Sequence, residues 1–297
     1  MSPRRDRTVT VFVPVFDNET TLDELVRRVL ATFEPTGRLV EVLLVDDASR
    51  DASWERIRAL HDLDPRVRGL RLGRNVGTGT VRAVACTHAR GELMCAIDGD
   101  LDYDPDELLL VLAALDVGND FVSGVRPRQR DRRATRRAGS TLLRLLMGRA
   151  LLCRPRDLAC GLQGWDARLH ERILPSLQTH RDVAWAITFL QQVERYAEVD
   201  ISGYREQASA SSFSTMRQAA RLAEVAAAIW PRSGRAAVAG GAALTAAAVV
   251  PWRRHPLRAV GGAAAGLSLV GAGALLARFD PRRTDRGAAY EVVDRVG

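Results

Sequence analysis

The sequence predicts an α/β fold in which a mostly parallel central sheet carries helices on both faces. Five short apolar stretches alternate with helix-like segments, at residues 8–15, 39–45, 67–72, 93–97 and 121–125. This alternation is typical of parallel sheets, because each parallel connection needs a crossover, usually a helix. A chain of 297 residues can also bury a full core.

The helices expected between these strands have recognisable ends. Thr21 and Glu24 form a capping-box pattern for a helix that runs through residue 30. Asp51 or Ser53 is placed to cap the second helix. The two later helices are expected to end at residue 88 and to span residues 106–115.

Two carboxylates, Asp98 and Asp100, follow the fourth apolar stretch with only Gly99 between them. Side chains two residues apart in a strand point the same way, so both are expected to face one point beyond the sheet. Paired carboxylates together with substrate phosphates suit Mg²⁺ or Mn²⁺, which makes them candidate metal ligands. The alternative is an ordinary acidic turn, because Asp104-Pro105 is itself a turn signal.

Polar loops also follow the first three strands, at residues 14–19, 46–51 and 73–79. Ligands of open α/β sheets bind beyond the carboxyl ends of the strands, so these loops are expected to line one crevice. The glycines of 73–79 expose backbone N–H groups that suit an anion at a helix N-terminus. The dinucleotide fingerprint is missing after the first strand, which disfavours a nicotinamide-dependent enzyme.

The charge and the cysteines restrict the partners and the compartment. A net charge of +7 indicates anionic partners such as phosphates, a membrane surface or nucleic acid. Interleaved aromatic residues are missing around the arginines, so no nucleic-acid partner is expected. No signal peptide is expected at the N-terminus. The cysteines lack metal-ligand spacing and are expected to be reduced, mostly buried thiols of a cytosolic domain: Cys86, Cys95, Cys153 and Cys160.

The C-terminal third contains two apolar, small-residue segments, at 235–252 and 257–279, with arginines around both. Their lengths approach the roughly 20 residues that span a bilayer, and their glycines would allow close helix packing in lipid. We expect a two-helix transmembrane hairpin over 235–279, with both ends on the cytosolic side. The alternative is a buried Ala-rich hairpin in a soluble protein.

Four segments carry a resemblance to a known family. They are Pro14-Val15-Phe16-Asp17-Asn18-Glu19, Val45-Asp46-Asp47-Ala48-Ser49-Arg50-Asp51, Arg74-Asn75-Val76-Gly77-Thr78-Gly79 and Asp98-Gly99-Asp100-Leu101. In this order they resemble family 2 glycosyltransferases of the GT-A fold, and more narrowly the polyprenyl-phosphate sugar transferases. That group contains the dolichol-phosphate mannose synthases and the bacterial undecaprenyl-phosphate glycosyltransferases. Later segments also match, at 125–126, 136–140, 160–165, 197–201 and 204–205.

The resemblance implies a donor site. Asp98 and Asp100 correspond to the DxD pair that holds Mg²⁺ or Mn²⁺, with Asp100 the direct ligand. Arg205 is expected to neutralise the departing diphosphate, so Asp98, Asp100 and Arg205 form the expected catalytic set. Asp47 is expected to hold the base or ribose, whereas Asp46 has the alternative of an N-cap or turn carboxylate. The full set expected to bind the nucleotide sugar is Pro14, Phe16, Asn18, Glu19, Asp46, Asp47, Asn75 and Asp98.

The resemblance also implies an acceptor site, in which Arg126, Arg136 and Ser140 hold the phosphate of the lipid. Guanidinium groups suit a phosphate because their bonds to it are charge-assisted. The alternative is a solvated or headgroup-facing basic face, because residues 126–137 hold seven arginines. One departure concerns the family pattern Arg-x-x-Gly-x-Ser-Lys: Arg205 is kept, whereas its glycine and lysine are not, so the loop that closes over the donor is expected to be altered.

The implied reaction is inverting, metal-dependent transfer of a sugar from a nucleotide-diphospho-sugar, UDP rather than GDP, to a polyprenyl (undecaprenyl or decaprenyl) phosphate. The expected place is the cytoplasmic membrane, with a multi-pass chain, a cytosolic catalytic domain and a possible homo-oligomer. The expected organisation is a GT-A domain at 1–230 (donor half 8–125, acceptor half 126–230), the hairpin at 235–279 and a polar tail at 280–297. Two alternatives stay open: a GT-A transferase with another acceptor, and a degenerate scaffold that binds nucleotide or lipid without turnover.

Overall fold

A computed structural model describes residues 6–127, 155–157, 160–170, 172, 190, 192–205 and 290–297. These residues belong to one compact unit. The arginine-rich run around Arg136, Ser140, Cys153 and the apolar segments of 235–279 lie outside the described residues. Among the residues that are described, no helix is long and apolar enough to cross a membrane.

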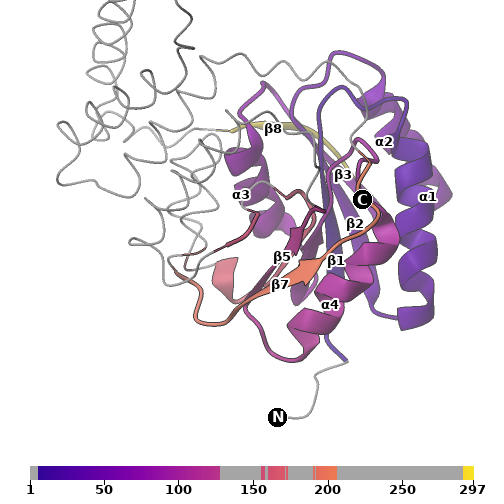
Figure 1. The fold of residues 1–297 in the computed structure, drawn as a ribbon. Coiled ribbons are helices and arrows are strands. Elements are labelled where there is room, and N and C mark those ends of the chain that lie inside the picture. Colours follow the sequence, from indigo (N-terminus) through magenta and orange to yellow (C-terminus); the bar gives the residue numbers. More distant parts are fainter. Residues whose placement is uncertain are drawn as a thin grey trace, which may run out of the picture. The chain divides into compact units, whose positions relative to one another are not determined.

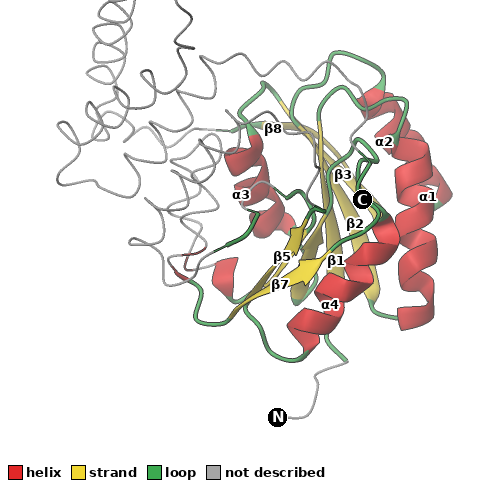
Figure 2. Ribbon diagram, in the orientation of Figure 1, coloured by secondary structure: helices red, strands yellow, loops and turns green. Residues whose placement is uncertain are grey.

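The unit is built on one eight-stranded sheet with the order β7-β5-β6-β4-β1-β2-β3-β8 (Figures 1 and 2). Its strands are β1 (Val9–Val15), β2 (Leu39–Asp46), β3 (Val67–Leu72), β4 (Leu93–Ala96), β5 (Phe121–Val125), β6 (Gln163–Asp166), β7 (Tyr196–Asp200) and β8 (Val292–Val296). The helices are α1 (Leu22–Phe33), α2 (Ser53–Leu63), α3 (Thr78–His88) and α4 (Leu108–Asp116), with short 3₁₀ turns η1 (Glu34–Thr36) and η2 (Pro105–Glu107).

The centre of the sheet is parallel, as the sequence predicts. β1 pairs with β4 on one side and β2 on the other, and β2 pairs with β3, all in parallel. β5 and β7 are also parallel, whereas β6 and β8 run antiparallel to their neighbours. The carboxyl ends of β4, β1, β2 and β3 therefore meet at one edge.

Helices cover both faces of the sheet. One face of β1 presents Val9, Val11, Val13 and Val15, all buried in a core to which α1, α2 and α4 contribute. The opposite face presents Phe12, and Arg82 of α3 lies over its ring. Figure 1 shows α3 on one side of the sheet, and α1, α2 and α4 on the other. Burial on both faces explains why these strands read as continuous apolar runs.

The last strand comes from the opposite end of the chain. The sequence reading treats residues 280–297 as a polar tail, yet Val292–Val296 form β8 at the free edge of β3. Asp294 accepts a hydrogen bond from the indole of Trp54 (3.1 Å), and the Glu291 carbonyl accepts one from the Gly73 N–H (3.0 Å). Edge strands are half-exposed and paired at long range, so the local pattern of β8 is weak.

Two further sequence expectations have clear outcomes. The prediction of a capping box at Thr21 is wrong. The Thr21 side chain makes no cap hydrogen bond, and its hydroxyl instead donates to the Gly99 carbonyl at 2.6 Å. The expectation of reduced, buried thiols is confirmed for Cys86, Cys95 and Cys160, which are free and buried.

Candidate active site

The loops that follow β1 and β2 are bound to each other at the carboxyl edge of the sheet. The Asp17 N–H donates to Ser49 Oγ (3.0 Å), and the Asn18 N–H donates to Ser53 Oγ (2.8 Å). The Glu19 carboxylate accepts from the Ala52 N–H at 2.9 Å. Polar side chains of one loop thus satisfy the backbone of the other, which fixes their relative position.

The loops after β2 and β3 are joined by a single carboxylate. Both oxygens of Asp47 accept backbone hydrogen bonds, from the N–H groups of Val76 (2.7 Å) and Gly77 (3.0 Å). Asp47 is buried, whereas Asn75, another residue expected to bind the nucleotide sugar, is exposed on the loop that carries Val76 and Gly77. Asp47 therefore holds the glycine-rich turn at the start of α3 in this structure.

Asp46 is the last residue of β2 and makes its contacts at the start of the following loop. It is wholly buried, its Oδ1 accepts from the Ser49 N–H (2.9 Å), and Arg71 lies 3.4 Å from its Oδ2. Burial raises the pKa of this carboxyl. Asp46 thus forms the turn that presents Asp47, and its contact with a nucleotide stays a prediction.

The acidic motif follows β4 and packs against the first loop. β4 ends at Ala96, so Asp98 and Asp100 lie in a turn beyond the strand and not in the strand geometry that the sequence suggested. A Cβ added to Gly99 would come within 2.9 Å of Asn18 Oδ1 and 3.1 Å of the Pro14 carbonyl. Glycine between the two aspartates is therefore what lets the turn lie this close to the β1 loop.

Asp98 is partly buried and Asp100 is exposed. Burial, and then the neighbouring charge of Asp100, raises the pKa of Asp98 to about 6. A cation bound here would offset both unfavourable effects. The donor set of two carboxylates thus fits Mg²⁺ or Mn²⁺ shared with a diphosphate. Within the described part of the chain no group of three or more His, Cys, Asp or Glu side chains could hold a metal alone.

Gly161 closes the site from the side of β6. A Cβ added to Gly161 would lie only 1.9 Å from Asp98 Oδ2, so a side chain there would displace the carboxylate. The Gly161 N–H donates to the Tyr103 hydroxyl at 2.9 Å. The sequence resemblance included this segment but gave Gly161 no role, since the contact becomes visible only when β6 pairs with β4.

A buried arginine acts on the charge of the acidic motif. Arg82 is 4% exposed, and its guanidinium lies 5.8 Å and 5.7 Å from the ring centroids of Phe12 and Trp165. Burial lowers the pKa of Arg82 to about 10, so it stays cationic at neutral pH, and its charge opposes the upward shift of the pKa of Asp98. Sequence analysis missed Arg82, although a lone arginine in the small apolar helix α3 is a visible signal.

The loops of the site hold strained backbone. The described residues other than glycine with positive φ are Asp17 (55°), Ala48 (59°) and Leu101 (60°), one each in the loops after β1, β2 and β4. Left-handed backbone costs such residues of order 1–3 kcal/mol and tends to cluster at functional sites. The coincidence of all three with one edge supports a binding role for that edge.

The remaining expected residues divide between this edge and its neighbourhood. Phe16 is 41% exposed, Pro14 and Asn18 are partly buried, and Asn18 Oδ1 accepts from the Phe16 N–H at 2.9 Å. Arg205 is exposed, and its N–H donates to the Asp102 carbonyl at 2.7 Å. The structure therefore brings residue 205, distant in sequence, beside the acidic turn.

Arg126 has a local partner. Its guanidinium forms two hydrogen bonds with the Asp157 carboxylate, at 2.7 Å and 2.9 Å, and lies 5.3 Å from the ring centroid of Tyr204. Burial acts to lower the pKa of Arg126, but its bonds to Asp157 outweigh this and raise it. A phosphate at Arg126 would have to share the guanidinium with Asp157.

Known glycosyltransferases resemble this chain in sequence. The sequence profile of "Glycosyl transferase family 2" matches residues 10–168. Over 174 residues the chain is 32% identical to undecaprenyl-phosphate 4-deoxy-4-formamido-L-arabinose transferases of Salmonella paratyphi A and Salmonella enteritidis, covering 56% of this chain. The matched stretch covers 53% of those proteins, so the chain spans about half the length of the curated relatives it matches.

Two solved structures are similar in fold. Glucosyl-3-phosphoglycerate synthase from Mycobacterium tuberculosis, solved with Mn²⁺, UDP-glucose and phosphoglyceric acid, has a TM-score of 0.55 at 17% identity, over 77% of this chain and 80% of that one. A mannosyltransferase from Pyrobaculum calidifontis, solved with GDP-mannose and Mn²⁺, has a TM-score of 0.54 at 19% identity, over 97% and 85%. The shared fold is the GT-A-like α/β fold that the sequence predicts.

The raised pKa of Asp98 makes a prediction for stability. The folded value of about 6 lies above the ordinary 3.8, so the fold favours the protonated form and loses stability as pH rises from 4 through 6. Metal-free Asp98→Asn is expected to exceed wild type in unfolding free energy by roughly 1–3 kcal/mol at pH 7.5, with the difference disappearing near pH 4. Urea unfolding in EDTA measures it, with the exposed Asp62→Asn as control; equal stabilities at both pH values would contradict it.

Proposed function

Because the chain belongs to glycosyltransferase family 2, we propose that it transfers a sugar from a nucleotide-diphospho-sugar to the phosphate of a polyprenyl lipid. The observation that carries the proposal is the joined set of loops at one sheet edge, to which the loop after β4 contributes Asp98 and Asp100. The relatives named for undecaprenyl-phosphate sugar transfer support the lipid acceptor. The two fold neighbours, solved with UDP-glucose or GDP-mannose and Mn²⁺, support the donor and the metal.

In the proposed donor complex, Asp98 and Asp100 would hold Mg²⁺ or Mn²⁺. The metal would supply positive charge to the departing diphosphate. Asp47 and the turn that it holds are proposed to contact the nucleoside, together with Pro14, Phe16 and Asn18. Arg205, next to the acidic turn, adds a cation to the leaving group. We take UDP as the nucleotide, with GDP as the alternative that the assay separates.

The acceptor side needs no general base. A phosphate monoester oxygen is already ionised at neutral pH and can attack the anomeric carbon as the bond from that carbon to the diphosphate oxygen breaks. The nucleoside diphosphate leaves, and the configuration at the anomeric carbon is inverted. Arg126 is the described candidate to orient the acceptor phosphate, with Arg136 and Ser140 as further proposed partners outside the described residues.

The proposed membrane location draws on the position of β8. β7 and β8 belong to the same sheet, so the chain between them starts and ends on one side of any membrane. If 235–279 crosses the bilayer, it must cross an even number of times, which agrees with a two-helix hairpin. We therefore propose that the described unit works at the cytosolic membrane face.

The transfer reaction is directly measurable. Detergent-purified full chain with Mn²⁺ is expected to move labelled sugar from a UDP-sugar to undecaprenyl phosphate, detected as a lipid-linked product. Asp100→Ala is expected to lower this rate about 100-fold or more, since it removes a metal ligand from the leaving group, whereas Asp62→Ala on the exposed face of α2 leaves it unchanged. Transfer that persists in Asp100→Ala would refute the metal assignment. Nucleotide binding without transfer from any UDP- or GDP-sugar would instead favour a scaffold.

The hairpin is tested by excision. Replacing residues 235–279 by a short flexible linker keeps β8, which a simple C-terminal truncation would remove. The full chain is expected to sediment with membranes and the excised form to remain in the supernatant while keeping its nucleotide affinity. Undiminished membrane sedimentation of the excised form would rule out 235–279 as the main anchor.

A further inference from the structure

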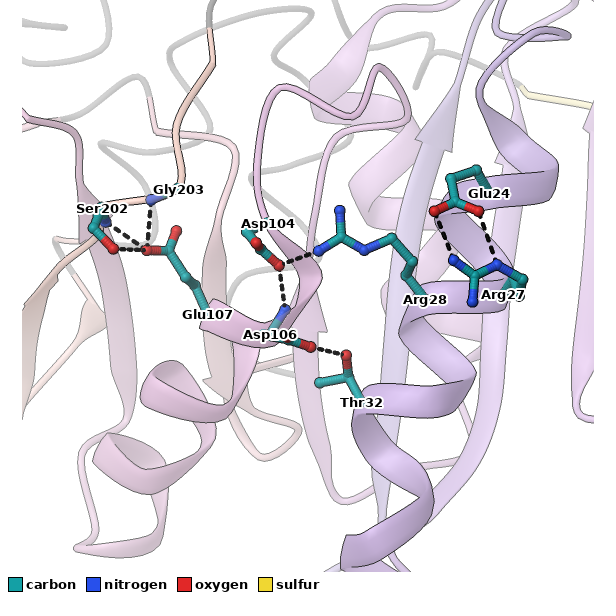
Figure 3. Close-up of polar contacts among 9 residues, drawn as sticks. All are labelled: Glu24, Arg27, Arg28, Thr32, Asp104, Asp106, Glu107, Ser202 and Gly203. Atoms are coloured by element: carbon teal, nitrogen blue, oxygen red, sulfur yellow. Dashed lines mark hydrogen bonds and ion pairs between the residues drawn. The ribbon is translucent and has the colours of Figure 1, made fainter.

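Glu107 holds a distant turn through one carboxylate oxygen. The residue is 8% exposed, and its Oε1 accepts three hydrogen bonds: from the Ser202 N–H (2.5 Å), the Ser202 hydroxyl (3.0 Å) and the Gly203 N–H (2.9 Å). Figure 3 shows Ser202 and Gly203 converging on this oxygen. A buried carboxylate that accepts two successive backbone N–H groups fixes both the position and the direction of that backbone.

The turn also packs closely against Asp104, the residue that precedes η2. A Cβ added to Gly203 would lie 2.6 Å from Cβ of Asp104, so only glycine lets the chain pass here without displacement. Asp104 is itself held, because its Oδ1 accepts from the Asp106 N–H at 3.0 Å and pairs with Arg28 (Figure 3). The Ser202–Gly203 turn thus packs against residues just before α4 that are themselves held by hydrogen bonds and an ion pair.

The two residues that follow the turn contact the segment just after Asp98 and Asp100. The ring of Tyr204 lies 5.2 Å from that of Tyr103, and the Arg205 N–H donates to the Asp102 carbonyl at 2.7 Å. The Tyr103 hydroxyl accepts from the Gly161 N–H, and Gly161 lies against Asp98. The backbone from Ser202 to Arg205 is therefore held at both ends, by Glu107 at the turn and by the Asp102 carbonyl at Arg205.

We propose that Glu107 is a positioning residue that sets Arg205 beside the Asp98–Asp100 turn, acting through Ser202 and Gly203. The role of Arg205 in this proposal rests on the proposed function, whereas the positioning itself does not. Without the carboxylate, two backbone N–H groups and a hydroxyl lose the acceptor that they share, and the segment that carries Arg205 is released from the acidic turn.

The positioning is tested without catalysis by amide hydrogen exchange in the full chain. Glu107→Ala is expected to raise exchange of the Ser202 and Gly203 amides at least tenfold, because both lose their acceptor. Glu107→Gln keeps one acceptor oxygen and is expected to fall between this variant and wild type. The matched control is Asp106→Asn, one residue away, whose side chain contacts Thr32 instead (Figure 3). Unchanged exchange in Glu107→Ala would overturn the proposal.

The link to Arg205 is tested by a double-mutant comparison of sugar transfer. Glu107→Ala is expected to lower kcat about as much as Arg205→Ala, at least tenfold, and the double variant is expected to be no slower than Arg205→Ala alone. Additive losses would overturn the route through Arg205. If Glu107→Ala does not fold, Gly203→Ala disturbs the same turn from the loop side and carries the same expectations.

The failure of this inference differs from failure of the proposed function. If wild type transfers no sugar, the proposed function fails, and the exchange of Ser202 and Gly203 still decides whether Glu107 holds the turn. In that case the affinity of Mn²⁺ with UDP is the second readout, expected to weaken equally in Glu107→Ala and Arg205→Ala. Weakening in only one of them would overturn the inference.

Discussion

The parallel pairing of β1 with β4 on one side and β2 on the other is the constraint on which the rest of the site depends. It brings three polar loops to one edge, and their own side chains then bind them together: Ser49 and Ser53 hold the β1 loop, and Thr21 reaches the Gly99 carbonyl. Preorganisation of this kind lets a site hold a ligand without reordering its backbone.

The electrostatics of the site follow from where its charges are buried. Burial and the charge of Asp100 disfavour the ionised form of Asp98, whereas the positive charge of the buried Arg82 favours it. This is costly for the empty protein and favourable for a protein that binds a cation, which is the usual relation between stability and function at such sites. Glu107 and Asp47 have a structural role instead, because the carboxylate of each accepts hydrogen bonds from backbone N–H groups and so holds a loop.

Sequence analysis reached most of the central fold, because β1 to β5 are apolar runs ended by polar turns. It also expects Asp98, Asp100 and Arg205 in one site. The structure brings the backbone N–H of Arg205 to the Asp102 carbonyl, and the roles of the three side chains stay predictions. Sequence analysis could not find β8, because the pairing of Val292–Val296 with Val67–Leu72 links segments that lie far apart in the sequence. Gly161 and Glu107 escaped for the same reason: their contacts link segments about 60 and 95 residues apart, and no local pattern encodes such distances.

The central claim is that the Asp98 turn binds a metal together with a nucleoside diphosphate, and Gly161→Ala tests it without altering any charge. Calorimetric titration of UDP or GDP, whichever the wild type binds, is made with and without Mn²⁺. Because the added Cβ would lie 1.9 Å from Asp98 Oδ2, the account predicts Mn²⁺-dependent binding in wild type that weakens at least tenfold in a folded Gly161→Ala. Equal affinity in the two proteins, or wild-type binding that ignores Mn²⁺, would contradict it.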